Sequence, residues 1–290
     1  MKNVLEYLEQ SAKLYPDKTA VLDPEKSITY EELLYNARRI GSFLSEQEAP
    51  RRPVAVFMDK SVEALTAFMG IVAAGCFYIS INMDQPPVRI RQILETSNAG
   101  SVITLGEDSN VLKEAGYVGK CFDYHEMVKH EIRETALREI RDHFLDVDPL
   151  YCNFTSGSTG IPKGVLVSHR SVIDFMEYFP DLFHITEEDI IGNQAPFDFD
   201  VSVKDIYSTL KTGAAMVIIP KRMFSIPTLL LDYLCEQKVT TLIWAVSALC
   251  LVSQLKGFTY KVPDQINKVL FSGEAMPVKQ LNTWKKYLPD

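Results

Sequence analysis

The chain has 290 residues, 47% of them hydrophobic, which is enough to build a sizeable buried core. Its 30 basic side chains stand against 38 acidic ones, for a net charge of -8, and no long Lys/Arg run occurs, so the charge pattern argues against a nucleic-acid partner. No apolar run approaches the length of a membrane span, and the N-terminus lacks the apolar stretch of a signal peptide, so we expect a cytoplasmic protein without a membrane partner.

The first half of the chain alternates apolar strands with helical stretches. Residues 2–15 are predicted to form a helix and residues 19–23 a short strand. In residues 27–33 a strand turns into a helix, with Thr29 as the N-cap and Glu32 completing a capping box. Beyond them we expect strands at 54–58 and 101–105 and helices at 61–74 and 87–97. This alternation predicts an α/β fold of mostly parallel sheets flanked by helices.

Residues 106–148 are more polar and charged than the segments around them, with residues 131–145 as a solvated helix. We therefore predict two domains, residues 1–148 as a first α/β subdomain with a connecting helix and residues 149–290 as a second α/β subdomain. In the second subdomain, strands are expected near 190–195, 214–219, 240–246 and 268–272.

The segment 155–164, Thr-Ser-Gly-Ser-Thr-Gly-Ile-Pro-Lys-Gly, has the composition of a phosphate-binding loop. Its glycines permit backbone angles closed to other residues, so amide N–H groups can converge on phosphate oxygens, while its hydroxyls and Lys163 add donors and a positive charge. Strand-like runs at 150–154 and 164–167 flank it, which is unusual for a linker, although a plain flexible Gly/Ser loop is the alternative. The common mononucleotide loop is disfavoured because Gly164, and not a hydroxyl residue, follows Lys163.

This string resembles the signature loop of the adenylate-forming superfamily, which includes acyl-CoA synthetases, luciferases and the amino-acid adenylation domains of nonribosomal peptide synthetases. Residues 73–82 with 86–90, and residues 272–277, are similar to two further segments of that superfamily in the same order. Residues 193–196 and 205–207 resemble D-alanine:carrier-protein ligases, the closest group. The resemblance implies the N-terminal large-domain portion of the adenylate-forming fold, truncated before the C-terminal small domain, so that the second subdomain is incomplete.

The resemblance also implies ATP and Mg²⁺ as cofactors, with the loop around the β- and γ-phosphates and the turn after residue 272 against the adenine. Lys163 and Thr155 are the candidate catalytic residues. The candidate nucleotide-binding residues are Thr155, Ser156, Gly157, Ser158, Thr159, Gly160, Lys163, Gly273, Glu274 and Ala275. No metal ligand is predicted, because the five cysteines lie without paired spacing and are expected to be reduced thiols.

Residues 195–203 indicate the class of substrate. The register Phe199-Asp200-Val201-Ser202 reproduces the Phe-Asp-x-Ser pattern of amino-acid adenylation domains, which implies that Asp200 binds the α-ammonium of an amino acid. A partly desolvated ammonium needs an opposite charge in contact, since an unpaired buried ion is costly. The segment has no histidine, which acyl-CoA synthetases usually carry here. The alternative is that Asp200 caps the helix beginning near Val201.

Lys204 follows Asp200 by about one helical turn, where its ammonium could meet an acidic substrate side chain, pair with Asp200 or remain solvated. D-alanine:carrier-protein ligases commonly have an apolar residue in place of Lys204 and a cysteine in place of Ser272, so the chain departs from them at both positions. The candidate substrate-binding residues implied by the resemblance are Asp200, Val201, Lys204, Trp244, Leu270 and Ser272.

The resemblance implies a ligase that activates an amino acid as aminoacyl-AMP and transfers it to the phosphopantetheine thiol of a carrier protein. An AMP-forming acyl- or aryl-CoA synthetase and a non-catalytic nucleotide-binding fragment are the alternatives. Later segments of the superfamily, with a magnesium-binding glutamate and a lysine that contacts the acyl phosphate, are absent from residues 1–290. We therefore expect the missing C-terminal portion of the same enzyme to be a partner, and these residues alone to be inactive.

Overall fold

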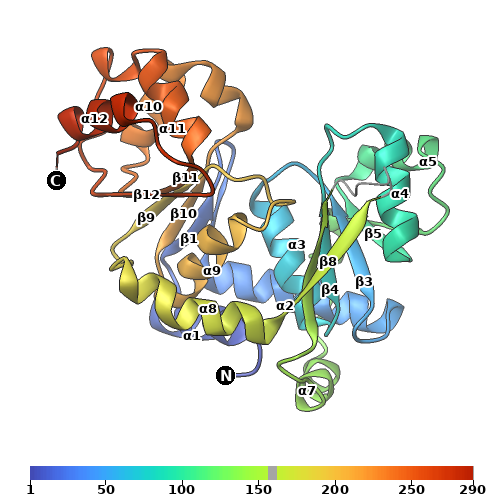
Figure 1. The fold of residues 1–290 in the computed structure, drawn as a ribbon. Helices are drawn as coiled ribbons and strands as arrows, with labels where there is room; N and C mark the ends of the chain where they lie inside the picture. The colour runs from blue at the N-terminus through green and yellow to red at the C-terminus, as the bar shows by residue number, and fades with distance from the viewer. Residues whose placement is uncertain (156–161, 290) are drawn as a thin grey trace.

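The structure is a computed structural model that describes residues 1–155 and 162–289. Its strands form two six-stranded sheets, called sheet A and sheet B, which lie beside each other with helices between them (Figure 1). The strands of sheet A, in spatial order, are β12 (Lys268–Ser272), β11 (Thr241–Ala245), β9 (Ile190–Asn193), β10 (Ala215–Ile218), β1 (Thr19–Leu22) and β2 (Ser27–Thr29). Those of sheet B are β6 (Lys120–Asp123), β5 (Ser101–Thr104), β3 (Pro53–Phe57), β4 (Phe77–Ile81), β7 (Pro149–Thr155) and β8 (Lys163–Ser168).

The described strands pair in parallel except for β1 with β2 and β7 with β8, which are antiparallel. This arrangement confirms the predicted α/β fold of mostly parallel sheets. Each sheet combines strands from before and after residue 148, since β1 and β2 join sheet A whereas β7 and β8 join sheet B. The division into domains at that residue stays a prediction.

One hydrophobic core fills the space between the sheets and holds the central helices. It includes Val21 and Ile218 of sheet A and Val54 and Tyr78 of sheet B, so both sheets bury side chains in the same cluster. Such sharing of apolar surface fixes the sheets relative to each other. The central helices are α1 (Leu5–Leu14), α2 (Tyr30–Gln47), α3 (Val62–Ala73), α8 (His169–Leu182) and α9 (Ser202–Thr212).

The remaining helices cover outer faces and connections (Figure 1). Helices α10 (Pro227–Glu236), α11 (Val246–Gln254) and α12 (Val278–Tyr287) pack on the outer face of sheet A. Helices α4 (Pro87–Ser97) and α5 (Ser109–Glu114) pack on that of sheet B. The connections contain α6 (Tyr124–Met127), α7 (Glu134–Asp142) and the 3₁₀ turns Gly106–Asp108, Lys221–Ser225 and Gly257–Thr259. Helix α7 has no buried residue, as predicted for a solvated helix.

Helix α2 begins and packs as its sequence predicts. The Thr29 hydroxyl accepts a hydrogen bond from the Glu32 amide, and the Glu32 carboxylate accepts one from the Thr29 amide, which confirms the capping box. Helix α2 then lies close against α3, because Gly70 of α3 has no side chain to separate them. A Cβ atom on Gly70 would be 2.3 Å from Cγ2 of Ile40.

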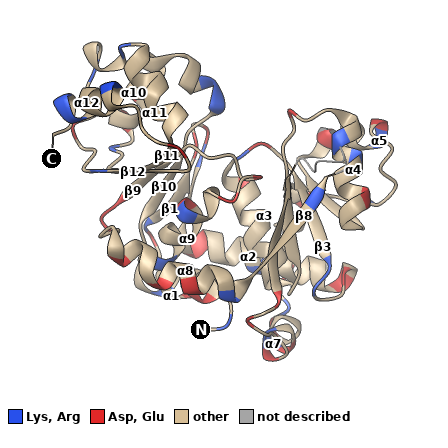
Figure 2. Ribbon diagram, viewed as in Figure 1, with Lys and Arg blue, Asp and Glu red and all other residues tan. Residues whose placement is uncertain are grey.

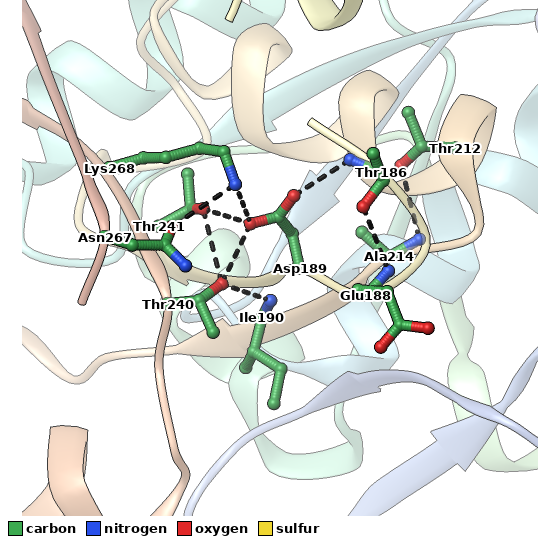
Figure 3. Close-up of polar contacts among 10 residues, drawn as sticks. All are labelled: Thr186, Glu188, Asp189, Ile190, Thr212, Ala214, Thr240, Thr241, Asn267 and Lys268. Carbon is green, nitrogen blue, oxygen red and sulfur yellow. Dashed lines mark hydrogen bonds and ion pairs between the residues drawn. The ribbon is translucent and has the colours of Figure 1, made fainter. Parts of the chain in front are cut away.

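A buried carboxylate secures the amino end of β9 (Figure 3). Asp189 accepts hydrogen bonds from the Thr186 amide at 2.8 Å, the Thr241 hydroxyl at 2.6 Å and the Lys268 ammonium at 2.8 Å. The Thr240 hydroxyl, at 2.9 Å, adds a further donor. Although burial opposes ionisation, these donors together lower the pKa of Asp189. The cluster ties β9 to β11 and β12, so the opposite, carboxyl ends of these strands are held in register.

Acidic and basic residues both lie on the outer helices α4 and α5 of sheet B, whereas the charged residues of α12 on sheet A are basic (Figure 2). Within the described part of the chain, every helix falls short of the length or apolarity that a membrane crossing requires.

Candidate functional site

A pocket of about 420 Å³ lies between the two sheets, at the carboxyl ends of the strands of sheet A. The last residue of β12, Ser272, forms one wall, and the segment that leaves β9 leads to Asp200 on another. Ligands of parallel α/β sheets bind at this end of the strands. The lining residues are Tyr151, Val167, Ser171, Val172, Phe175, Asp200, Val201, Val203, Lys204 and Ser272. The pocket therefore contains the predicted substrate residues Asp200, Val201, Lys204 and Ser272.

Asp200 does not serve as the cap of helix α9. The helix begins at Ser202, and Val201 precedes it in a helical conformation without a side-chain capping bond. The contribution of Asp200 to the first turn comes from its backbone oxygen, which accepts from the Val203 amide at 3.1 Å. Its carboxylate lines the pocket near Tyr151, whose pKa is raised to about 12 by burial and by the negative charge of Asp200. Capping, the alternative from the sequence, therefore does not explain this aspartate.

Lys204 points its ammonium across the pocket to Ser272. Its Nζ donates a hydrogen bond to the Ser272 hydroxyl at 2.9 Å and lies 6.0 Å from the ring centre of Phe179. Among residues 1–155 and 162–289, the ion pairs within 4.0 Å do not include one between Lys204 and Asp200. The pocket thus has a carboxylate and an ammonium that are not paired with each other.

Two predicted pocket residues lie elsewhere. Trp244 is buried on the outer face of sheet A, where its indole N–H donates to the Gly192 carbonyl at 2.7 Å and its ring packs against Phe224. Successive strand residues point to opposite faces, so its neighbour Ile243 faces the central core instead. The interpretation of Trp244 as a pocket residue does not fit this placement. Leu270, paired with Ile243, packs against the central core but does not line the pocket.

Thr155 is the last residue of β7 and Lys163 the first residue of β8, and the two lie opposite each other in the β7–β8 ladder. The Thr155 hydroxyl is 3.5 Å from the Lys163 carbonyl oxygen, and both residues are exposed. The predicted strands on the two sides of the loop are therefore confirmed, and the structure pairs them with each other. The other predicted phosphate-loop residues, Ser156, Gly157, Ser158, Thr159 and Gly160, lie outside the described residues.

The predicted adenine-binding turn follows β12 directly. Gly273 has φ of 91°, a conformation that favours glycine, and Glu274 and Ala275 after it are exposed. Gly273 thereby turns the chain away from β12 immediately after Ser272. Because Ser272 lines the pocket, the turn begins at the pocket wall.

A buried polar network behind the pocket was not predicted from the sequence. Lys60, just after β3, donates to the Asn193 side-chain oxygen at 3.0 Å and to the Gln194 carbonyl at 3.0 Å. The amide of Asn193 in turn donates to Asp205 of helix α9 at 2.6 Å. Burial lowers the pKa of Lys60 and raises that of Asp205. No local sequence pattern predicts these contacts, because Lys60 is more than a hundred residues from Asn193 in the chain.

Comparison with known proteins gives concordant results. Residues 8–290 match the protein family described as AMP-binding enzyme. Tyrocidine synthase 1 of Brevibacillus parabrevis is 28% identical over 291 residues, which cover 99% of this chain and 26% of that protein. A D-alanine–D-alanyl carrier protein ligase of Bacillus velezensis is 30% identical over 285 residues, 94% of this chain and 54% of the ligase.

Among solved structures, the nonribosomal peptide synthetase FmoA3 superposes with a TM-score of 0.86 at 26% identity, covering 99% of this chain and 30% of the FmoA3 chain. The N-terminal domain of FACL13 from Mycobacterium tuberculosis superposes with a TM-score of 0.87 at 21% identity, covering 99% and 73% of the two chains, and shows the same fold. The chain thus spans between about a quarter and about a half of the two sequence relatives named above.

Proposed function

Because this chain belongs to the AMP-binding enzyme family, with residues 8–290 matched, we propose that it forms the ATP- and substrate-binding part of a ligase that activates an amino acid as aminoacyl-AMP. The observation that carries the proposal is the carboxylate of Asp200, which forms no ion pair with the described residues, in a pocket at the carboxyl ends of a parallel sheet. The similarity to tyrocidine synthase 1 and to a D-alanine–D-alanyl carrier protein ligase supports an amino-acid substrate and a carrier-protein acceptor with a phosphopantetheine thiol.

The role proposed for Asp200 is to hold the α-ammonium of the substrate. Its carboxylate is exposed to the pocket, is free of helix capping and stands beside the apolar side chains of Val201 and Val203. An ammonium that enters this wall loses part of its hydration, and a contacting carboxylate compensates for that loss. A fatty acid, which has no amino group, would leave the Asp200 charge without this partner.

The exposed ends of the β7–β8 hairpin fit a polyphosphate. Lys163 offers an ammonium and Thr155 a hydroxyl at one point of the sheet edge, and phosphate oxygens accept from both. We propose that these groups, with residues 156–160, hold the leaving pyrophosphate of ATP, and that Mg²⁺ accompanies the nucleotide. A related structure, FmoA3 with bound AMPPNP, supports a nucleotide in this fold. Catalysis would then rest on positioning and charge neutralisation of the transferred group.

The reaction joins the substrate carboxylate to the α-phosphorus of ATP. One carboxylate oxygen forms the new bond to the α-phosphorus. The bond between the α-phosphorus and the oxygen that bridges it to the β-phosphate breaks, and its electron pair leaves with pyrophosphate. The protein residues orient the two reactants and share no covalent bond with them. We propose further that residues 1–290 do not turn over substrate when produced alone.

Amino-acid-dependent exchange of pyrophosphate into ATP tests the proposal in the full-length protein that contains this chain. Asp200→Ala is expected to raise the KM for the amino acid by about 100-fold while the KM for ATP changes little. Asp181→Ala, an exposed position at the end of α8, serves as the matched control. If Asp200→Ala weakened both substrates equally, the role of Asp200 in binding the ammonium would be rejected.

An AMP-forming acyl- or aryl-CoA synthetase is the alternative function. The substrates and acceptors that the protein uses distinguish it from an amino-acid ligase. Supplying carboxylic acids without an amino group, and coenzyme A in competition with a carrier protein, distinguishes the two ligases. Turnover restricted to such acids would contradict an amino-acid substrate. Nucleotide binding without turnover of any substrate would point to a non-catalytic protein.

A further inference from the structure

The pocket holds two opposite charges on one short stretch of chain. Asp200 precedes helix α9 and Lys204 lies in its first turn, and both line the same cavity. The Val203 amide donates to the Asp200 carbonyl at 3.1 Å and the Lys204 amide to the Val201 carbonyl at 3.2 Å, so tight backbone turns carry the chain from Asp200 to Lys204. A ligand that lies along this turn therefore meets a negative group and a positive group in succession.

The ammonium of Lys204 is available to a ligand. Its hydrogen-bonding partner is the neutral hydroxyl of Ser272 at 2.9 Å, which also lines the pocket. An ammonium has three N–H donors, so the bond to Ser272 leaves donors for a further acceptor. Within the described ranges, Lys204 takes part in none of the ion pairs within 4.0 Å.

Asp205, the acidic group next along the helix, is a weak competitor for Lys204. Its side chain is fully buried, accepts from the Asn193 amide at 2.6 Å and is not among the residues that line the pocket. Burial raises the pKa of Asp205, so its negative charge is disfavoured. Among the described residues Lys204 and Asp205 form no ion pair within 4.0 Å, so the Lys204 ammonium keeps its capacity to pair with a ligand.

We propose that the side-chain pocket selects an amino acid with an acidic side chain, whose second carboxylate pairs with Lys204 while its α-ammonium pairs with Asp200. This inference rests on the proposed amino-acid activation. Binding of substrate removes water from the pocket, and an ammonium left unpaired in a dry site costs several kcal/mol. A substrate carboxylate removes that cost and accepts charge-assisted hydrogen bonds from Lys204, whereas an aliphatic side chain does neither.

The remaining pocket walls suit an amino acid with an acidic side chain. Tyr151, Val167 and Phe175 supply apolar surface against the methylene groups, and Ser272 holds the Lys204 ammonium in place. A basic side chain would meet the Lys204 charge directly, and repulsion of like charges would exclude it. The neutral amides asparagine and glutamine have the right shape but lack the charge, so they measure the electrostatic part of the selection.

The experiment is pyrophosphate exchange by the full-length protein with aspartate, glutamate, asparagine, glutamine, alanine and lysine. We expect kcat/KM for the preferred acidic amino acid to exceed that for its amide by about 100-fold. The strongest exchange with a neutral or basic amino acid would overturn the inference and leave amino-acid activation intact. Exchange with none of the amino acids, while another carboxylic acid is turned over, would reject the proposed function itself.

Two variants separate the charge of Lys204 from its packing. Lys204→Met keeps most of the apolar stem and is expected to lower kcat/KM for the acidic substrate by about 100-fold, with the KM for ATP unchanged. Lys204→Glu is expected to reverse the preference toward lysine. Lys211→Met, on the same helix but bound to the Met176 carbonyl at 2.6 Å outside the pocket, is the control and should keep the wild-type preference. Retention of the acidic preference by Lys204→Met would also overturn the inference.

Discussion

The ammonium of Lys60 joins the two sheets through Asn193. It donates to the side-chain oxygen of Asn193 at 3.0 Å and to its backbone oxygen at 3.1 Å. Lys60 follows β3 of sheet B, whereas Asn193 ends β9 of sheet A, so the contact lies at the junction between the sheets. Asn193 also starts the segment that leads to Asp200. The position of the pocket wall that contains Asp200 thus depends on a residue from the other sheet.

Lys60→Met is expected to weaken both stability and substrate binding. The change leaves the oxygens of Asn193 and Gln194 without their buried donor, which costs about 1–3 kcal/mol of unfolding free energy. Urea unfolding measures this loss of stability. In pyrophosphate exchange, the substitution should raise the KM for the amino acid more than it raises the KM for ATP. Lys120→Met, at an exposed lysine with long contacts of 3.4 Å, is the control. Equal stability of the two variants would contradict the bridging role.

Much of the fold follows from local sequence signals. The capping box at Thr29 and Glu32 and the alternation of apolar strands with helices identify most elements, because these signals act over a few residues. The assignment of strands to sheets does not follow in the same way. Strand β1 joins sheet A by pairing with β10, which is distant in the chain, and β2 follows it through its own pairing with β1.

The candidate site shows the same limit. Asp200 and Lys204 could be placed together from sequence because only three residues separate them, and both line the pocket. The partner of Lys204 is Ser272, which only the folded sheet brings near. The direction of Trp244 depends on the phase of its strand, and a shift by one residue sends a side chain to the opposite face. The apolar pattern therefore predicted the strand near 240–246, and the resemblance did not fix which of its side chains faces the pocket.

Tyr78 and Tyr207 form a second link between sheet B and helix α9. Their hydroxyls are 3.0 Å apart, and both side chains are buried. Tyr207→Phe leaves the Tyr78 hydroxyl without this partner and is expected to lower the unfolding free energy by about 1–3 kcal/mol. The double variant Tyr78→Phe with Tyr207→Phe should recover part of the loss, because no hydroxyl is then stranded. A double-mutant cycle by urea unfolding checks this, and strictly additive losses would contradict the pairing.

The contact between α2 and α3 depends on Gly70. A Cβ atom there would lie 2.3 Å from Cγ2 of Ile40 and 3.3 Å from the Ala37 carbonyl oxygen. Gly70→Ala is therefore expected to destabilise the protein by about 1–3 kcal/mol, despite the better helix propensity of alanine, because the helices must separate. Gly100→Ala is the control, since the nearest atom to its added Cβ is 4.0 Å away. Thermal unfolding compares the variants, and an unchanged Tm for Gly70→Ala would show that the helices adjust freely.

His169 is expected to contribute to the loss of stability in acid. Its ring is fully buried, Nδ1 accepts from the Val4 amide at 3.2 Å, and burial lowers its pKa to about 3. An unfolded histidine titrates near 6.5, so the unfolded chain binds more protons than the folded one between these values. The stabilising contribution is therefore complete above pH 6.5 and declines as the pH falls toward 3, by up to about 1.4 kcal/mol per pH unit.

Urea unfolding from pH 7 to pH 4 should show a shallower decline in unfolding free energy for His169→Gln than for wild type, because the Gln side-chain oxygen can still accept from the Val4 amide. The control is His184→Gln, at an exposed position, which should decline like wild type. Parallel declines in all three proteins would show that His169 is not the titrating group.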